Sequence, residues 1–321
     1  MLIAIAGEEG RISLVKGCEA IRQRQEMYSV DSFSVVDNSI FDLIFIENKN
    51  MVVVGTGDQS VLFVDIEKCA VEDVKIGHFG TVLSLSTLGN CVLSGGRDGN
   101  VCLWDYRTKE SIFSINLKQN NSILAIEAIS DQVFFTGDSH GNLFCWDPRN
   151  IKKPLMNLKN PSTNSRIPIS ALSISPNHRY LASLETNNDL TFFAIENDFN
   201  SAKQNWENIG GFYIKCCFSP CSKYLLTGST SGSLNIFKVG QNKEPQVIMG
   251  HTASSTCVQW ENESFDYILS CSDDKTIQIW SSEYKTVEDY EPDFEINNNF
   301  KNNKKEKKKY SLKNTTLYNY I

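Results

Sequence analysis

One pattern recurs seven times along the chain, and it constrains the fold more than any other feature of the sequence. Each copy is an apolar run, a short turn rich in Gly, Asp or Asn, and a second, alternating run that ends in a large apolar residue. The ending residues are Val15, Val64, Trp104, Trp146, Phe193, Phe237 and Trp280. Successive copies are 40 to 49 residues apart, which is typical of architectures in which each unit packs against its neighbours.

The runs between the turns have the alternation of short, half-buried strands, as in residues 122–129 and 256–260. Glycines at positions 99 and 232 supply the positive φ that a tight hairpin needs. Almost no helical periodicity is present. The sequence therefore predicts an all-β protein with about four strands in each unit.

A period near 40–45 residues with four short strands per unit is typical of a β-propeller. The sequence resembles the WD-repeat family over residues 1–285. The residues that carry this resemblance are Trp104-Asp105, Trp146-Asp147, Trp280, Gly77-His78 and Gly250-His251. The resemblance implies a seven-bladed propeller, in which blades stack because one four-stranded sheet cannot bury both of its faces alone.

The first unit lacks part of its blade. It begins at Met1 with what look like the outer two strands. Three explanations remain open: the end of the chain completes that blade, the first blade is reduced, or the start of the gene is misplaced.

The sequence shows neither a signal peptide nor a membrane-spanning run. The first ten residues have no basic segment, and no window approaches 18 uncharged apolar residues. The ten cysteines form no CxxC pair, which indicates a reducing compartment without a disulfide framework.

Catalytic and metal-binding patterns are missing from the sequence. Of the four histidines, His78 and His251 follow glycine at the start of a blade, where a structural hydrogen bond is expected, and His140 and His178 lie in turns. No HExxH, GxSxG, GxGxxG or P-loop pattern occurs. We therefore expect a binding protein rather than an enzyme, with no cofactor and no metal.

Charge is distributed unevenly along the chain. The net charge is −7, but the tail from Phe300 onward carries +6, which leaves −13 on residues 1–299. Nucleic-acid affinity depends on clustered Lys and Arg, so at most a weak nucleic-acid contact is expected, and only through the tail. An acidic body suits a basic partner.

Both WD dipeptides continue into arginine, which gives two WDxR boxes on consecutive blades. Such boxes resemble those of propellers that act as substrate receptors of cullin-four RING ubiquitin ligases. That resemblance implies that the boxes bind the ligase adaptor, the large damaged-DNA-binding protein subunit. The residues assigned to this contact are Trp104, Asp105, Arg107, Trp146, Asp147 and Arg149. A guanidinium just beyond a strand can form several charge-assisted hydrogen bonds with an acidic partner.

Longer stretches are similar to the denticleless family, receptors that mark the replication-licensing factor for destruction on the DNA sliding clamp. They include residues 41–47, 95–100, 212–220, 226–230 and 271–276, in family order. The resemblance implies a nuclear, non-catalytic receptor that recruits substrate proteins, with the cytoplasm as an alternative location. It requires both guanidinium groups to lie along one rim, free of salt bridges within their own blades. The alternative is a WD-repeat scaffold of a chromatin or RNA-processing complex, in which the arginines are incidental.

The tail, residues 286–321, is rich in Asn and Lys, and disorder is expected there. Its basic run fits a nuclear-import signal, made of Lys304, Lys305, Lys307, Lys308 and Lys309, or equally a solubilising tail. The last residues resemble the short motif that fills the hydrophobic pocket of the sliding clamp. That motif comprises Asn314, Leu317, Tyr320 and Ile321, and one helical turn would place its apolar members on one face.

Overall fold

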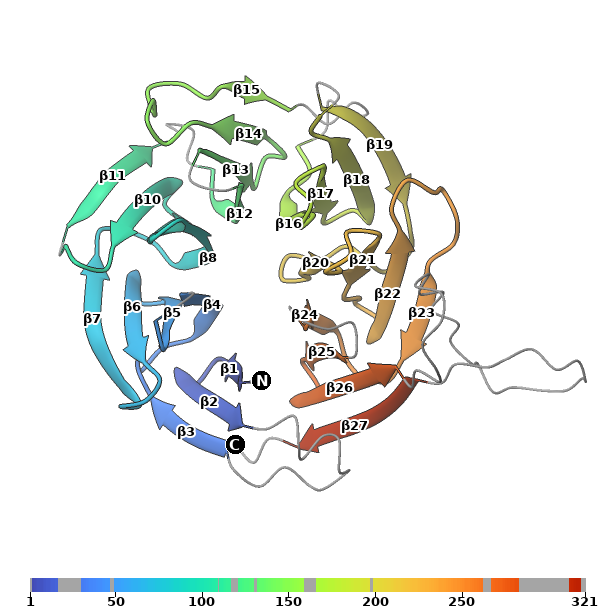
Figure 1. The fold of residues 1–321 in the computed structure, drawn as a ribbon, viewed down its shortest axis with the longest axis horizontal. Helices are drawn as coiled ribbons and strands as arrows, with labels where there is room; N and C mark the ends of the chain where they lie inside the picture. The colour runs from blue at the N-terminus through green and yellow to red at the C-terminus, as the bar shows by residue number, and fades with distance from the viewer. Residues whose placement is uncertain are drawn as a thin grey trace, which may run out of the picture. The chain divides into compact units, whose positions relative to one another are not determined.

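The computed structural model describes residues 2–16, 30–46, 49–108, 110–116, 121–129, 132–158, 166–196, 199–261, 267–282 and 312–318. These residues form seven antiparallel sheets, here sheets A to G in chain order, and none of them is in a helix. The protein is an all-β, seven-bladed propeller, as the repeat predicted (Figure 1). The described residues contain no helix long and apolar enough to cross a membrane.

The chain divides into two compact units, residues 1–174 and 175–321. The strands of the first unit, sheet by sheet, are β1 (Leu2–Ala6), β2 (Arg11–Lys16) and β3 (Val30–Ser34) in A; β4 (Ile40–Ile46), β5 (Met51–Thr56), β6 (Ser60–Asp65) and β7 (Ala70–Ile76) in B; β8 (Val82–Leu88), β9 (Cys91–Gly96), β10 (Asn100–Asp105) and β11 (Ser111–Asn116) in C; β12 (Ile123–Ile129), β13 (Val133–Asp138), β14 (Leu143–Trp146) and β15 (Met156–Asn157) in D; and β16 (Ile169–Ile174), the first strand of E.

The second unit holds the remaining strands. These are β17 (Tyr180–Glu185), β18 (Asp189–Ala194) and β19 (Asn200–Asn205) in E; β20 (Cys216–Phe218), β21 (Tyr224–Thr227), β22 (Ser233–Lys238) and β23 (Gln246–Met249) in F; and β24 (Ser255–Trp260), β25 (Tyr267–Ser272), β26 (Thr276–Ser282) and β27 (Leu312–Tyr318) in G.

Burial differs among the strands of one sheet. In sheet C every residue of β10 is buried, and β9 is buried at all positions but its first, whereas in the fourth strand, β11, exposed residues alternate with partly or fully buried ones. A strand covered on both faces accepts a continuous apolar run, and a peripheral one keeps the alternation. The hydrophobic cores accordingly lie between neighbouring sheets of each unit.

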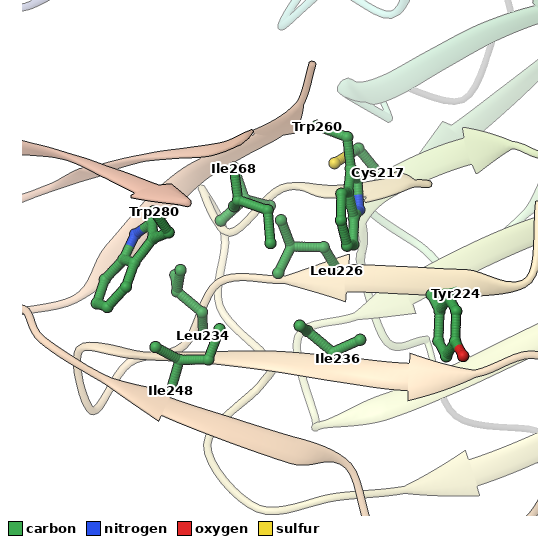
Figure 2. Packing of buried hydrophobic residues seen from close by; sticks show 10 residues of the cluster. Cys217, Tyr224, Leu226, Leu234, Ile236, Ile248, Trp260, Ile268 and Trp280 are labelled. Atoms are coloured by element: carbon green, nitrogen blue, oxygen red, sulfur yellow. The ribbon is translucent and has the colours of Figure 1, made fainter. Parts of the chain in front are cut away.

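The core between sheets F and G illustrates this packing in the second unit. Leu226 and Ile236 of sheet F meet Trp260, Ile268 and Trp280 of sheet G (Figure 2). Trp260 and Ile268 are each 1% exposed. At about 1.5–3 kcal/mol for each large apolar side chain fully buried, contacts of this kind provide the main force that stacks one sheet on the next.

Sheet A corrects one detail of the sequence interpretation. It contains three strands in the order β1-β2-β3, with β1 paired to β2 along its whole length. Two missing strands were expected, and among the described residues the sheet is one strand shorter than its neighbours. The sequence signal for β3 was weak because only Val30 and Phe33 in that strand are strongly apolar.

The end of the chain departs from the predicted tail at seven residues. Leu312–Tyr318 form β27, an edge strand of sheet G that pairs with β26 in antiparallel register. Disorder was predicted for the whole of residues 286–321, but these seven are extended, because pairing satisfies the backbone groups along the edge of β26. They complete sheet G and not sheet A. The rest of the predicted tail lies outside the described residues.

Candidate functional site

The tryptophans near the ends of the third strands of sheets C and G are held by a polar network that includes the histidine of the Gly-His pair. In sheet C, Trp104 Nε1 donates to Ser94 Oγ at 2.7 Å, and the same hydroxyl lies 2.7 Å from His78 Nε2. His78 Nδ1 lies 3.2 Å from an Asp98 oxygen. A Cβ on Gly77 would stand 2.7 Å from the Trp104 ring, so glycine is needed there to leave room for the indole.

Sheet G repeats this arrangement with different residues. Trp280 Nε1 donates to Ser270 Oγ at 2.9 Å, and His251 bridges Ser270 and Asp274 at 2.8 and 3.0 Å. His78 and His251 are both buried. The structural role predicted for these two histidines is confirmed, because each is engaged inside its own sheet.

The two WDxR boxes lie at equivalent places in consecutive sheets of the first unit. Arg107 follows β10 of sheet C, and Arg149 follows β14 of sheet D. Each arginine is therefore in the turn between the third and fourth strands, at the same edge of its sheet. The common edge that the ligase hypothesis requires is present.

Each guanidinium is held by the aspartate of its own box. Arg107 Nε and Nη2 donate to Asp105 at 3.0 and 2.6 Å, and Arg149 Nε and Nη2 donate to Asp147 at 3.0 and 3.1 Å. These hydrogen bonds lower the pKa of the Asp105 carboxyl to about 2, and the same cause lowers the pKa of Asp147. The expectation that neither arginine is paired within its own blade is therefore wrong.

The pairs leave much of each guanidinium accessible. The side chains of Arg107 and Arg149 are 67% and 72% exposed. Tyr106 is the third residue of the first box, and Lys49 Nζ lies 3.0 Å from its ring centre, a contact that the motif did not predict. Trp104 and Trp146 are buried, so the tryptophans position the boxes and the arginines are their accessible part.

The predicted C-terminal motif is only partly described. Asn314 and Leu317 lie in β27, opposite Trp280 and Ile277. The backbone is extended at Leu317, so the predicted helical turn does not begin there. Tyr320 and Ile321 lie outside the described residues, as do the five lysines of the predicted import signal.

The described ranges contain no cluster of potential metal ligands. No three His, Cys, Asp or Glu residues come together there in a group that could hold a metal ion. Burial raises the pKa of the Cys145 thiol to about 11, which makes it a poor nucleophile.

One buried carboxyl group was missed by the sequence analysis. Glu185 ends β17 and is 2% exposed, and its Oε2 has no hydrogen-bond partner among the described residues. Burial raises its pKa to about 7, and the charge of Asp189 adds to the rise while Lys203 opposes it. A glutamate at the end of a predicted strand gave no sign of this burial.

This carboxyl predicts a pH dependence of stability. The pKa of Glu185 in the folded state exceeds the unfolded value of about 4.3. The stabilisation that the protonated carboxyl gives to the fold is therefore complete below that value and is lost as the pH rises to about 7. Glu185→Gln should raise the free energy of unfolding by on the order of 2 kcal/mol at about pH 8. Chemical denaturation at several pH values measures this, with Glu244→Gln on the surface as control. Parallel pH profiles of wild type and Glu185→Gln would contradict the assignment.

Comparison with known proteins finds a matching repeat model and several similar chains. The family model "WD domain, G-beta repeat" matches residues 71–105, 210–238 and 242–281. The denticleless protein homolog of Danio rerio is 25% identical over 87% of this chain and 49% of its own length. Protein lethal(2)denticleless of Drosophila melanogaster is 24% identical over 87% of this chain and 42% of its own length. Pre-mRNA-processing factor 17 of Homo sapiens is 24% identical over 60% of this chain and 33% of its own length. The chain thus spans half or less of the length of these curated relatives.

Proposed function

We propose that this WD-repeat propeller, similar to denticleless proteins along 87% of its length, is a non-catalytic substrate-recognition subunit of a cullin-four RING ubiquitin ligase. The observation that carries the proposal is the pair of exposed arginines at the same edge of sheets C and D. The damaged-DNA-binding adaptor subunit binds this edge. The recruited substrates are replication proteins on the DNA sliding clamp, and the site of action is the nucleus.

The ion pairs inside the boxes contradict the requirement of unpaired arginines, but their small energy still permits adaptor binding. An exposed ion pair contributes about 0–1 kcal/mol, so an acidic partner can share or replace the aspartate at little cost. Arg107 donates to Asp105 through Nε and Nη2. These two hydrogen bonds do not use its Nη1 group, which can donate to a partner. A guanidinium that is already oriented loses less side-chain entropy on binding than a freely rotating one.

Affinity for the purified adaptor tests this proposal. Arg107→Ala and Arg149→Ala should each weaken binding by roughly 30-fold, about 2 kcal/mol, as is common for arginines at the centre of an interface. Arg179→Ala is the matched control, because Arg179 is also exposed and paired with an acid, Glu196. Thermal unfolding of each variant verifies that the fold is kept. If a folded double variant, Arg107→Ala with Arg149→Ala, binds the adaptor with unchanged affinity, the boxes are not part of the interface.

A scaffold role in an RNA-processing complex is the second candidate. It is favoured by the similarity to pre-mRNA-processing factor 17 over 60% of the chain. Affinity purification followed by mass spectrometry separates the two. Recovery of cullin and adaptor supports the receptor, whereas recovery of splicing factors without either supports the scaffold.

A further inference from the structure

Sheet D departs from sheets C and G in the turn between its second and third strands. Asp98 and Asp274 each lie four residues after the serine that accepts from the tryptophan of their sheet. In sheet D the corresponding acceptor is Thr136, which receives the Trp146 hydrogen bond at 3.0 Å. The residue four positions later is His140. An imidazole thus stands where the other two sheets place a carboxylate.

Asp138, beneath this turn, is fully engaged by the protein itself. Its Oδ1 accepts from the backbone amides of His140 and Asn142 at 2.9 and 2.8 Å. Its Oδ2 accepts from the side-chain amides of Asn121 and Asn142 at 3.0 and 2.7 Å. The carboxylate is 1% exposed. Four hydrogen bonds stabilise its charge inside the turn, so it does not present a bare negative charge to the solvent above.

A pocket of about 460 Å³ opens above the turn, lined by Asn121, His140, Asn142 and Arg166. Gly141 explains how Arg166 comes to lie there. This glycine has a φ of +76°, and a Cβ on it would stand 2.5 Å from the carbonyl oxygen of Ile167. The turn therefore packs directly on the segment that begins with Arg166, and a larger residue at position 141 would push the two apart.

The charge that lines the pocket is positive. Arg166 is exposed, and it forms no hydrogen bond or ion pair within the described ranges of the chain. The His140 ring is partly exposed, with Ser139 Oγ at 3.3 Å from Nδ1. A guanidinium beside an imidazole provides donors that suit an anionic oxygen group, whereas the side-chain amides of Asn121 and Asn142 already donate to Asp138.

We propose that this pocket binds an anionic side-chain group, a carboxylate or a phosphate, of a protein that the propeller recruits. The role of that protein as a degradation substrate rests on the proposed function, but the chemistry of the pocket does not. Asn142 immediately precedes β14 and the Arg149 box follows it, so the pocket and the box lie at opposite ends of one strand. A ligand in the pocket therefore leaves the boxed arginine accessible.

Peptide titrations followed by NMR test the pocket directly. The chain has only four histidines, so the imidazole signals are few, and His140→Gln identifies the one that matters. Three acetylated, amidated pentapeptides are compared, with phosphoserine, glutamate or serine between alanines, and inorganic phosphate is titrated separately. We expect the His140 signal to shift with the phosphoserine peptide, the glutamate peptide or both, and not with the serine peptide. A shift with phosphoserine alone identifies phosphate as the ligand chemistry.

Arg166→Gln supplies the decisive variant, because Arg166 is exposed and its replacement should leave thermal unfolding unchanged. Loss of a charge-assisted hydrogen bond should weaken anionic-peptide binding by roughly tenfold or more. Arg179→Gln removes the same charge elsewhere and should leave the affinity unchanged. Equal shifts with the serine peptide, binding of inorganic phosphate alone, an unaltered affinity in Arg166→Gln, or no shift with any peptide would each overturn the proposal.

Discussion

Trp104→Ala is expected to lower the free energy of unfolding of the first unit by about 4 kcal/mol. Trp104 is 1% exposed and packs in a core made by sheets B and C, together with Val53, Phe63 and Leu85. Its removal creates a cavity between two sheets that are joined mainly by apolar contact. It also leaves the Ser94 hydroxyl without the indole donor. Urea denaturation followed by circular dichroism measures the loss.

Two further variants separate packing from hydrogen bonding. Trp104→Phe keeps most of the ring volume but removes the Nε1 donor, so a smaller loss of about 1–2 kcal/mol is expected. Trp206→Ala is the matched control, because Trp206 is only partly buried. An equal loss in Trp104→Ala and Trp206→Ala would show that burial between sheets B and C does not govern stability.

Asp98→Ala is expected to cost about 3–5 kcal/mol near neutral pH, since removal of one partner leaves a buried charge uncompensated. The His78 side chain is fully buried against Asp98. Burial, the largest single influence, lowers the pKa of His78, but the hydrogen bonds and charges of Asp98 and Cys102 together outweigh it and raise the pKa to about 9. Asp98 also accepts from the backbone amides of Phe79 and Asn100 at 2.8 and 3.1 Å, and the alanine variant loses these bonds as well.

The His78–Asp98 pair also predicts that the free energy of unfolding depends on pH. Because the folded-state pKa of His78 exceeds the unfolded value of about 6.5, the stabilisation is complete below about pH 6.5 and is lost as the pH rises through 9. Asp98→Asn keeps the shape of the side chain and removes its charge, so its unfolding free energy should no longer fall across this window. A loss of about 2–3 kcal/mol between pH 6.5 and 9.5 is expected in the wild type. If Asp98→Asn keeps the wild-type dependence of the unfolding free energy on pH, the His78–Asp98 pair is not the source of that dependence.

The fold could be predicted because the repeats combine turn residues such as glycine with a terminal large apolar residue, which are strong local indicators of a hairpin and of the repeat length. Turn glycines such as Gly99 and Gly232 have positive φ in the structure, as the hairpins required, and the terminal tryptophans fixed the period. β3 and β27 were not foreseen for a physical reason. An edge strand is paired on one side only and half exposed, so its residues need not be apolar, and β27 lies in an Asn- and Lys-rich context.

The position of the candidate site could be predicted from the sequence, but the ion pairs of its arginines could not. Strand and turn counting placed Arg107 and Arg149 at one sheet edge, because equivalent turns of stacked meanders lie at equivalent places. The ion pairs within each box depend on side-chain rotamers, which sequence spacing does not determine. The pocket of sheet D was missed because Ser-His-Gly reads as an ordinary turn. Alignment of His140 with Asp98 and Asp274 would have revealed the substitution.

Pairing of β27 with β26 makes two uses of the same residues mutually exclusive. Leu317 belongs to the segment that resembles a clamp-binding motif, and its backbone is committed to the strand opposite Ile277. Engagement of a clamp by this segment would first require the strand to peel away, which exposes an unpaired sheet edge. Clamp-bound molecules would then carry an incomplete final blade, and protease sensitivity or hydrogen exchange along β26 would report how many molecules are engaged.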